Sequence, residues 1–108
     1  MNIEMLREYC LSLEGTEECF PFDEETLVFK VNGRIFVLAN LDGELEVNLK
    51  CDPALAIELR EWYPAIRPGY HMNKKHWNTV KADGSVPDKI FFEWIEHSYL
   101  LVRSSKKK

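Results

Sequence analysis

Two glycine-containing dipeptides constrain the fold of this chain more than any other feature. Asn32-Gly33 and Asp42-Gly43 separate three runs rich in β-branched and apolar residues, at positions 27–31, 34–41 and 44–50. Both dipeptides suit the type I′ turn of a two-residue β-hairpin, because asparagine, aspartate and glycine tolerate a positive φ. The sequence therefore predicts a three-stranded antiparallel meander.

The third run indicates what kind of sheet to expect. Its apolar side chains are Leu45, Val47 and Leu49, and they alternate with Glu44, Glu46, Asn48 and Lys50. Alternation with a period of two is typical of a strand that has one buried and one wet face. We therefore expect a sheet that is covered on one face.

Helices are expected before and after this meander. Apolar residues recur at three- and four-residue steps over residues 3–13, with Asn2 as N-cap and Gly15 as a left-handed closing residue. Asp52-Pro53 begins a second, short helix that stops at Pro64. The apolar face expected for this second helix is Leu55, Ile57, Leu59 and Trp62.

The last third of the chain predicts one more strand and one more helix. Pro68-Gly69 fits the centre of a type II turn, residues 76–82 have strand character, and a short strand around Ile66 is left open. The final helix starts at Pro87 and has the strongest apolar stripe, formed by Ile90, Phe91, Trp94, Ile95, Tyr99 and Val102. The expected order is α-β-β-β-α-(β)-β-α.

This order predicts an α+β domain over residues 1–103, with helices packed on one face of an antiparallel sheet and a polar basic tail at 104–108. A chain of 108 residues, 45% hydrophobic and 30% charged, can form a core without disulfides. No apolar run reaches the roughly 18 residues that span a bilayer, and the N-terminus lacks a secretory pattern. We therefore expect a cytoplasmic protein with no membrane partner.

Three stretches of the chain carry a family resemblance. They read PFDEETLVFKVNGRIFVL, YPAIRPGYHMNKKHWNTV and SYLLV. With the order of elements above, they resemble the YjbR family, also called MmcQ/YjbR, up to Val102. The resemblance implies a CyaY-like, frataxin-like α+β sandwich and an uncharacterised role with a proposed DNA-binding mode. It implies no set of catalytic residues.

The segment over residues 63–81 interleaves cations, rings and amides. Lysine and arginine neutralise phosphates, amides bond to base edges and rings stack on bases, so this composition suits a nucleic-acid surface. The candidate site residues are Arg67, His71, Asn73, Lys74, Lys75, His76 and Lys81. We therefore expect a small non-enzymatic binding module with DNA as its candidate ligand. Core packing and a turn already account for Trp77 and Pro68-Gly69.

Charge is divided unevenly along the chain. Residues 1–49 carry three basic and eleven acidic side chains, a balance of −8, whereas residues 50–81 carry six basic and three acidic, a balance of +3. The isoelectric point of about 5.4 is far below the value of about 9 that is typical of a DNA-binding domain. A second hypothesis is therefore a protein-interaction domain, in which Glu4, Glu8 and Glu14 of the first helix meet a basic partner.

Catalytic and metal chemistry have weaker support, and we expect no cofactor. His71 and His76 lack zinc spacing, and the cysteines, Cys10, Cys19 and Cys51, are odd in number without a C-x-x-C pair. A cysteine nucleophile, or any enzyme, would need the fold to bring a histidine to a nucleophile or acid in a pocket. An acidic series could attract hard cations, although such runs are usually solvated: Glu14, Glu17, Glu18, Asp23, Glu24 and Glu25.

Overall fold

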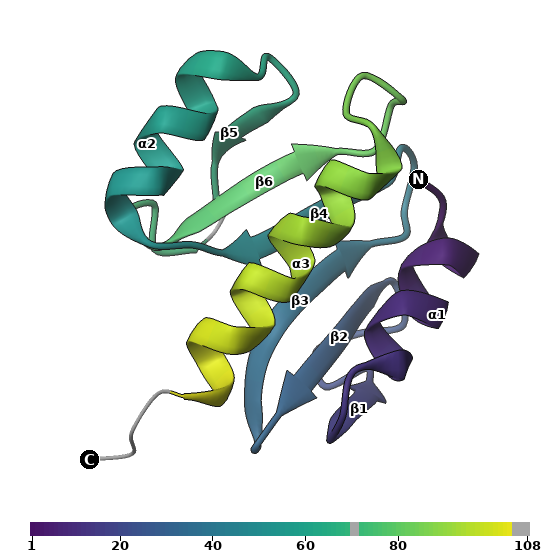
Figure 1. Ribbon diagram of the computed structural model, residues 1–108. Coiled ribbons are helices and arrows are strands. Elements are labelled where there is room, and N and C mark those ends of the chain that lie inside the picture. The colour runs from purple at the N-terminus through teal and green to yellow at the C-terminus, as the bar shows by residue number, and fades with distance from the viewer. Residues whose placement is uncertain (70–71, 105–108) are drawn as a thin grey trace.

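The predicted meander forms the centre of a larger antiparallel sheet. The computed structural model describes residues 1–69 and 72–104, and within them it has six strands in the order β1-β2-β3-β4-β6-β5 (Figure 1). The strands are β1 (Thr16–Cys19), β2 (Thr26–Val31), β3 (Arg34–Asn40), β4 (Glu46–Lys50), β5 (Ile66–Pro68) and β6 (Trp77–Lys81). The helices are α1 (Ile3–Ser12), α2 (Pro53–Trp62) and α3 (Asp88–Arg103). The α+β prediction is confirmed.

The two predicted hairpin turns differ. Asn32 and Gly33 have φ values of 54° and 77°, as a type I′ turn requires, and they join β2 to β3 directly. At the second turn Gly43 has a φ of 81°, but Asp42 is not in the positive region. The Asn40 side chain instead bonds to the backbone of Asp42, with its Nδ2 donating to the carbonyl and its Oδ1 accepting from the N–H, both at 3.3 Å. After this local turn β4 begins only at Glu46. The prediction of a type I′ hairpin at Asp42-Gly43 is therefore wrong.

Both edge strands are short. The sequence prediction omitted β1, because Thr16–Cys19 contains two glutamates and no apolar alternation, yet its four residues pair antiparallel with β2. A short, charged edge strand limits pairing with other chains. The strand left open around Ile66 is present as β5, and Pro68 suits its edge position because proline cannot donate to a ladder.

Gly69 has a different role from the one predicted. Its φ is outside the positive range that a type II turn requires, so that turn prediction is wrong. The Gly69 N–H instead donates to the carbonyl of Trp77 at 2.9 Å. A Cβ on Gly69 would lie 2.8 Å from the Trp77 Cβ, so this position needs glycine for a close approach between chain segments.

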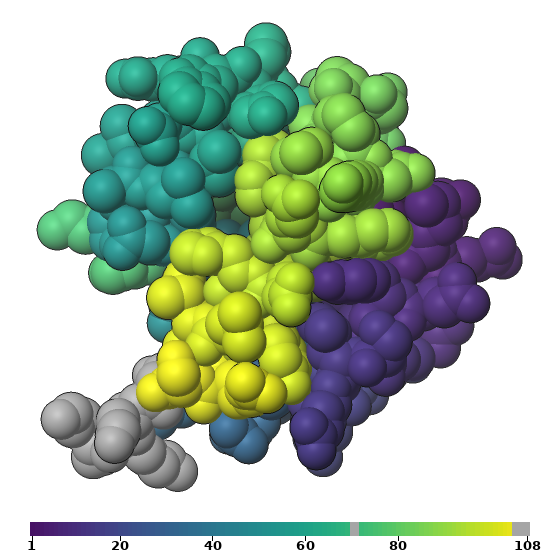
Figure 2. Space-filling model, viewed as in Figure 1, coloured from purple at the N-terminus to yellow at the C-terminus, as the bar shows by residue number. Residues whose placement is uncertain are grey.

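All three helices lie on one face of the sheet (Figure 1), and in the same view their atoms cover most of the strands (Figure 2). α3 packs across β2, β3 and β4, α1 packs on β1, and α2 packs on β5 and β6. The strand residues that meet them are Leu27, Phe29, Val37, Ala39, Val47, Leu49 and Val80. No helix in the described part of the chain is long and apolar enough to cross a membrane.

α2 buries a narrower stripe than its sequence predicts. Ala56 and Leu59 are buried, whereas Ile57 and Trp62 are 56% and 66% exposed. The helix lies at the edge of the sheet and contacts only β5 and β6 there, so a single row of its residues finds a partner. The predicted burial of Ile57 and Trp62 is therefore wrong.

A buried serine joins α3 to the sheet where β3 is irregular. The register between β2 and β3 shifts between Phe29 and Lys30, which leaves Phe36 as the extra residue of a bulge. The Ser98 hydroxyl donates to the Phe36 carbonyl at 2.7 Å and accepts from the Lys50 N–H at 2.9 Å. Ser98 is fully buried, so it satisfies two backbone groups that would otherwise lack partners.

Candidate functional site

Alternate strand residues point away from the helices onto the open face of the sheet. The register places one continuous row across all six strands: Cys19, Val28, Leu38, Asn48, Thr79 and Arg67. The half of this row on β1, β2 and β3 is apolar, and the half on β4, β6 and β5 is polar. A neighbouring row contains Thr26, Asn40, Glu46 and Lys81. These two rows, called the floor below, are therefore amphiphilic.

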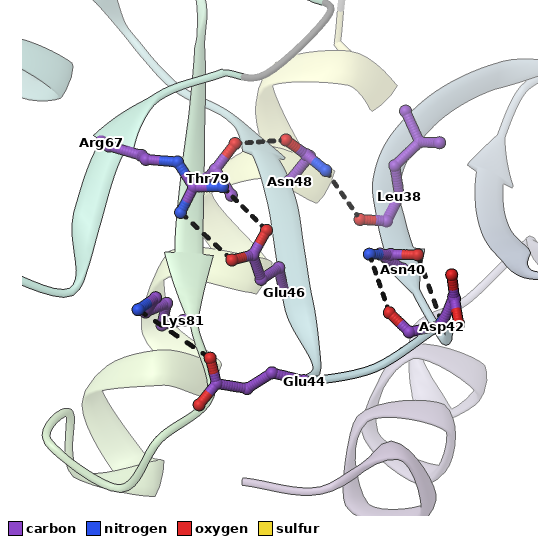
Figure 3. A network of polar contacts seen from close by, with 9 residues as sticks. All are labelled: Leu38, Asn40, Asp42, Glu44, Glu46, Asn48, Arg67, Thr79 and Lys81. Carbon is purple, nitrogen blue, oxygen red and sulfur yellow. Dashed lines mark hydrogen bonds and ion pairs between the residues drawn. The ribbon is translucent and has the colours of Figure 1, made fainter.

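The polar half of this floor is held in place by its own contacts (Figure 3). The Thr79 hydroxyl donates to Asn48 Oδ1 at 2.5 Å, and Asn48 Nδ2 donates to the Leu38 carbonyl at 3.4 Å. The Arg67 guanidinium donates to both oxygens of Glu46, at 2.8 Å and 3.2 Å. These bonds orient the side chains before any ligand arrives, which lowers the cost of binding.

A hollow of about 470 Å³ lies above this floor. Its described apolar lining residues are Phe22, Ile35, Leu38 and Met72, and its polar ones are Thr26, Asn40, Glu46, Asn48 and Thr79. Small-molecule sites usually have 300–1,000 Å³ and mainly apolar walls with a few polar groups. The hollow meets both criteria.

One wall of the hollow, at residues 20–25, contributes Phe22 to its lining. Asp23 Oδ1 accepts from the Glu25 N–H at 2.9 Å, and the Glu25 carbonyl accepts from the Leu41 N–H at 2.8 Å. Hydrogen bonds from the Glu25 backbone and then from the Thr26 side chain lower the pKa of Asp23. These bonds fix the segment that contains Phe22, whose side chain lines the hollow and is 64% exposed. A large exposed aromatic ring beside a hollow is a common feature of binding sites.

A second wall, at residues 72–76, contributes Met72 to the lining, and Arg60 of α2 holds this turn. Its guanidinium donates to Asn78 Oδ1 at 2.7 Å, to the Trp77 carbonyl at 3.4 Å and to the Lys74 carbonyl. Asn73 Oδ1 accepts from the Lys75 N–H at 2.9 Å, which closes the turn. A residue on the helix side of the sheet therefore positions the segment that carries Met72.

The residues predicted as a nucleic-acid site do not form one cationic surface. Arg67 and Lys81 lie on the open face, and each is close to a glutamate: Arg67 bonds to Glu46, and Lys81 Nζ is 3.8 Å from Glu44. Lys74 and Lys75 are at the opposite end of β6 from Lys81.

The remaining predicted residues belong to the 72–76 turn or precede it. Lys74 Nζ donates to the Gly69 carbonyl at 3.0 Å, Asn73 caps the turn, and the His76 N–H donates back to Asn73. Lys75 is exposed. His71 lies outside the described residues.

The residues that line the hollow were not predicted as a site. Leu38, Asn48 and Thr79 come from three strands and are far apart in the sequence. One signal was present, because polar side chains within a strand mark a face that no core covers. The sequence alone does not show that Phe22 and Met72 line one hollow above that face.

The geometry disfavours a cysteine nucleophile. Burial, and then the neighbouring Asp52 charge, raises the pKa of Cys51 to about 11. Burial also raises the pKa of Cys10. Both thiols therefore stay protonated near neutral pH, in the unreactive form. In the part of the chain that the structure covers, no three His, Cys, Asp or Glu side chains group closely enough to hold a metal ion.

The fold and the hollow define a small α+β protein with one open, amphiphilic sheet face, and comparisons place it within a family. The model of the YjbR family matches residues 11–101, so the chain belongs to the YjbR family. It is 40% identical to the uncharacterised protein YbdF of Escherichia coli O157:H7, over 92% of this chain and 82% of that protein. It is 35% identical to the uncharacterised protein YjbR of Escherichia coli K12, over 92% and 85% of the two chains.

Solved structures share the same fold. The Deinococcus radiodurans protein DR2400 is 43% identical and superposes with a TM-score of 0.93, over 99% of this chain and 82% of that one. A Pseudomonas syringae protein is 29% identical with a TM-score of 0.84, over 95% of this chain and all of the other. The stretches that carry the family resemblance include residues 21–25 and 72–76, and so both Phe22 and Met72 of the hollow.

Proposed function

We propose that the protein is a non-enzymatic binding module, and that it binds a small amphiphilic molecule in the hollow on the open face of its sheet. The main support for this proposal is the hollow of about 470 Å³, which lies over a floor that changes from apolar to polar across the strands. The apolar body of the ligand would lie on Leu38 and against Phe22. Its polar head would reach Asn48 and Thr79.

Binding without chemistry is the better supported form of this proposal. The described lining residues include no histidine, cysteine, serine or lysine, and their one carboxylate, Glu46, is engaged by Arg67. General acid–base or nucleophilic catalysis needs a group that can give or take a proton beside the reacting atom. His76 is not among these lining residues.

The test uses a neutral probe, 4-phenylbutanol, whose ring and hydroxyl match the two halves of the floor. A probe of this size should bind in the millimolar range, given about 0.3 kcal/mol per heavy atom. In two-dimensional NMR, we expect shifts in the side-chain amides of Asn40 and Asn48. Leu38→Trp fills the hollow and should weaken binding about tenfold or more.

The matched control is Leu11→Trp, on the 45% exposed outer side of α1. It should leave the affinity unchanged, and the amide spectra of both variants should report an intact fold. If Leu38→Trp binds the probe as well as the parent does, or if the shifts cluster elsewhere, the hollow is not the site.

DNA binding stays a prediction, with the candidate residues Arg67, His71, Asn73, Lys74, Lys75, His76 and Lys81. The observation that favours it is the turn of residues 72–76, which presents the exposed cation Lys75. A salt-titrated assay on duplex and single-stranded DNA would test it, with Lys74→Glu and Lys75→Glu as variants. Lack of binding at low salt, or no loss in the variants, would exclude it. The CyaY-like classification and the cytoplasmic location likewise stay predictions.

The alternative of an acidic docking face also stays a prediction. Glu4, Glu8 and Glu14 are exposed on or just after α1. Charge reversal at these three positions should release any basic protein partner that the wild-type chain captures from cytosol. An unchanged set of captured proteins would contradict that hypothesis.

A further inference from the structure

We propose that the ligand of the hollow carries a cationic head rich in N–H donors, such as a primary ammonium group, which binds at Glu46. This inference rests on the proposed function and specifies its ligand. The apolar body of such a ligand would extend from Glu46 over Leu38 toward Phe22, all of which line the same hollow.

Glu46 is the one charged side chain among the described lining residues. Its side chain is 22% exposed, so a partner there would be partly shielded from water. Arg67 donates one hydrogen bond to each carboxylate oxygen of Glu46. A carboxylate has about four acceptor positions, so Glu46 can hold Arg67 and accept from a second donor group.

The other polar groups on the floor have already committed donors to protein partners. The Thr79 hydroxyl donates its proton to Asn48 Oδ1, and Asn48 Nδ2 donates to the Leu38 carbonyl. Asn40 Nδ2 donates to the Asp42 carbonyl. Each of these amides keeps one further N–H, whereas Glu46 offers only acceptor positions, so at Glu46 a ligand head that donates fits better than one that accepts.

An anionic head is disfavoured by the same geometry. The described lining residues include no cation to pair with it, and an anion that approached Arg67 would lie beside the Glu46 carboxylate already bonded there. Like charges at this separation repel, and bidentate arginine–carboxylate pairs are among the stronger polar contacts. Asp23, Glu24 and Glu25 follow Phe22 in the sequence with no basic residue among them; they are not among the lining residues of the hollow, so they favour a cation only at longer range.

The test compares three probes that share one body: 4-phenylbutylamine, 4-phenylbutanol and 4-phenylbutyric acid. NMR titration should rank the amine about fivefold tighter than the alcohol, with the acid weakest. Glu46→Gln keeps the shape of the side chain and removes its charge, and it should bring the ratio of amine to alcohol affinity close to one. Added salt should reduce the same ratio in the parent protein.

Glu44→Gln is the matched control, because Glu44 is a carboxylate two residues away that pairs with Lys81 and is absent from the described lining. It should leave the preference for the amine intact. The inference fails if the acid binds as tightly as the amine, if amine and alcohol bind equally, or if Glu46→Gln keeps the preference. In those outcomes, binding of the alcohol in the hollow would still support the proposed function. If none of the three probes shifts signals of the hollow, both proposals fail.

Discussion

The same strands build two faces of the sheet with opposite properties. On the helix face Leu27, Val37 and Val47 are at most 2% exposed and pack in the continuous core. On the open face their strand neighbours Leu38 and Asn48 are half-buried and line the hollow. One face therefore supplies stability through apolar burial, whereas the other keeps apolar and polar groups within reach of a ligand.

The two faces also satisfy their polar groups differently. On the helix face Ser98 serves backbone atoms at a bulge, where no solvent can reach. On the open face the side chains bond mainly to one another, as Thr79 does to Asn48 and Arg67 to Glu46. Removing a partner should therefore be costly under the helices and milder at the Arg67–Glu46 pair, whose side chains are partly exposed so that water can replace the lost partner.

The largest expected difference comes from the same substitution on opposite faces. Leu27→Ala should lower the free energy of unfolding by about 2–5 kcal/mol, because it leaves a cavity in the core. Leu38→Ala should cost only about 1 kcal/mol, since this side chain is already partly in contact with solvent. Urea denaturation of both variants measures the contrast. Equal losses would show that something covers the open face as fully as the helices cover the other.

Ser98→Ala should cost about 1–3 kcal/mol, because the Phe36 carbonyl and the Lys50 N–H would be left buried without a partner. Ser12→Ala, at an exposed helix position, is the matched control and should change the free energy of unfolding by less than about 0.5 kcal/mol. Thermal or urea unfolding compares them. A loss at Ser98 no larger than at Ser12 would remove the proposed link between α3 and the bulge.

Arg60→Gln tests the connection between the faces. The variant loses the bonds that hold the turn of residues 72–76, so we expect a loss of about 1–2 kcal/mol and a shifted methyl signal from Met72. Arg7→Gln, on α1, breaks an exposed ion pair with Glu18 of β1. It should lower the free energy of unfolding by less than about 1 kcal/mol and leave the Met72 signal unchanged. An unmoved Met72 signal in Arg60→Gln would mean that the turn holds its position without α2.

The smallest effect concerns the pH response of the wall at residues 20–25. The pKa of Asp23 is lowered in the folded protein from its usual 3.8, so its contribution is present above that value and is lost as pH falls through the folded pKa. Hydrogen exchange at the Glu25 amide should therefore become less protected below about pH 3.8, relative to core amides. Asp23→Asn should weaken that protection at neutral pH, and Asp42→Asn is the control. Protection that is independent of pH would show that Asp23 does not hold the wall.

Much of the fold was predictable because its signals are local. Asn32-Gly33, the alternation along β4 and the stripe on α3 each depend on neighbours within a few residues. The errors also have local causes. The Asn40 side chain formed its own turn at Asp42, β1 is too short and acidic to show alternation, and α2 lies at an edge that buries only Ala56 and Leu59.

The sequence by itself determined the α+β class, the antiparallel meander, the presence of one wet sheet face and the family. Only the tertiary structure decided that Phe22 and Met72 line the same hollow above that face, and that Arg67 and Lys81 lie beside glutamates instead of joining Lys75 in a cationic surface. The physical reason is the range of the interactions. Strand and helix periodicity depends on residues close in sequence, whereas the hollow depends on a register that pairs β4 with β6 across the intervening α2 and β5.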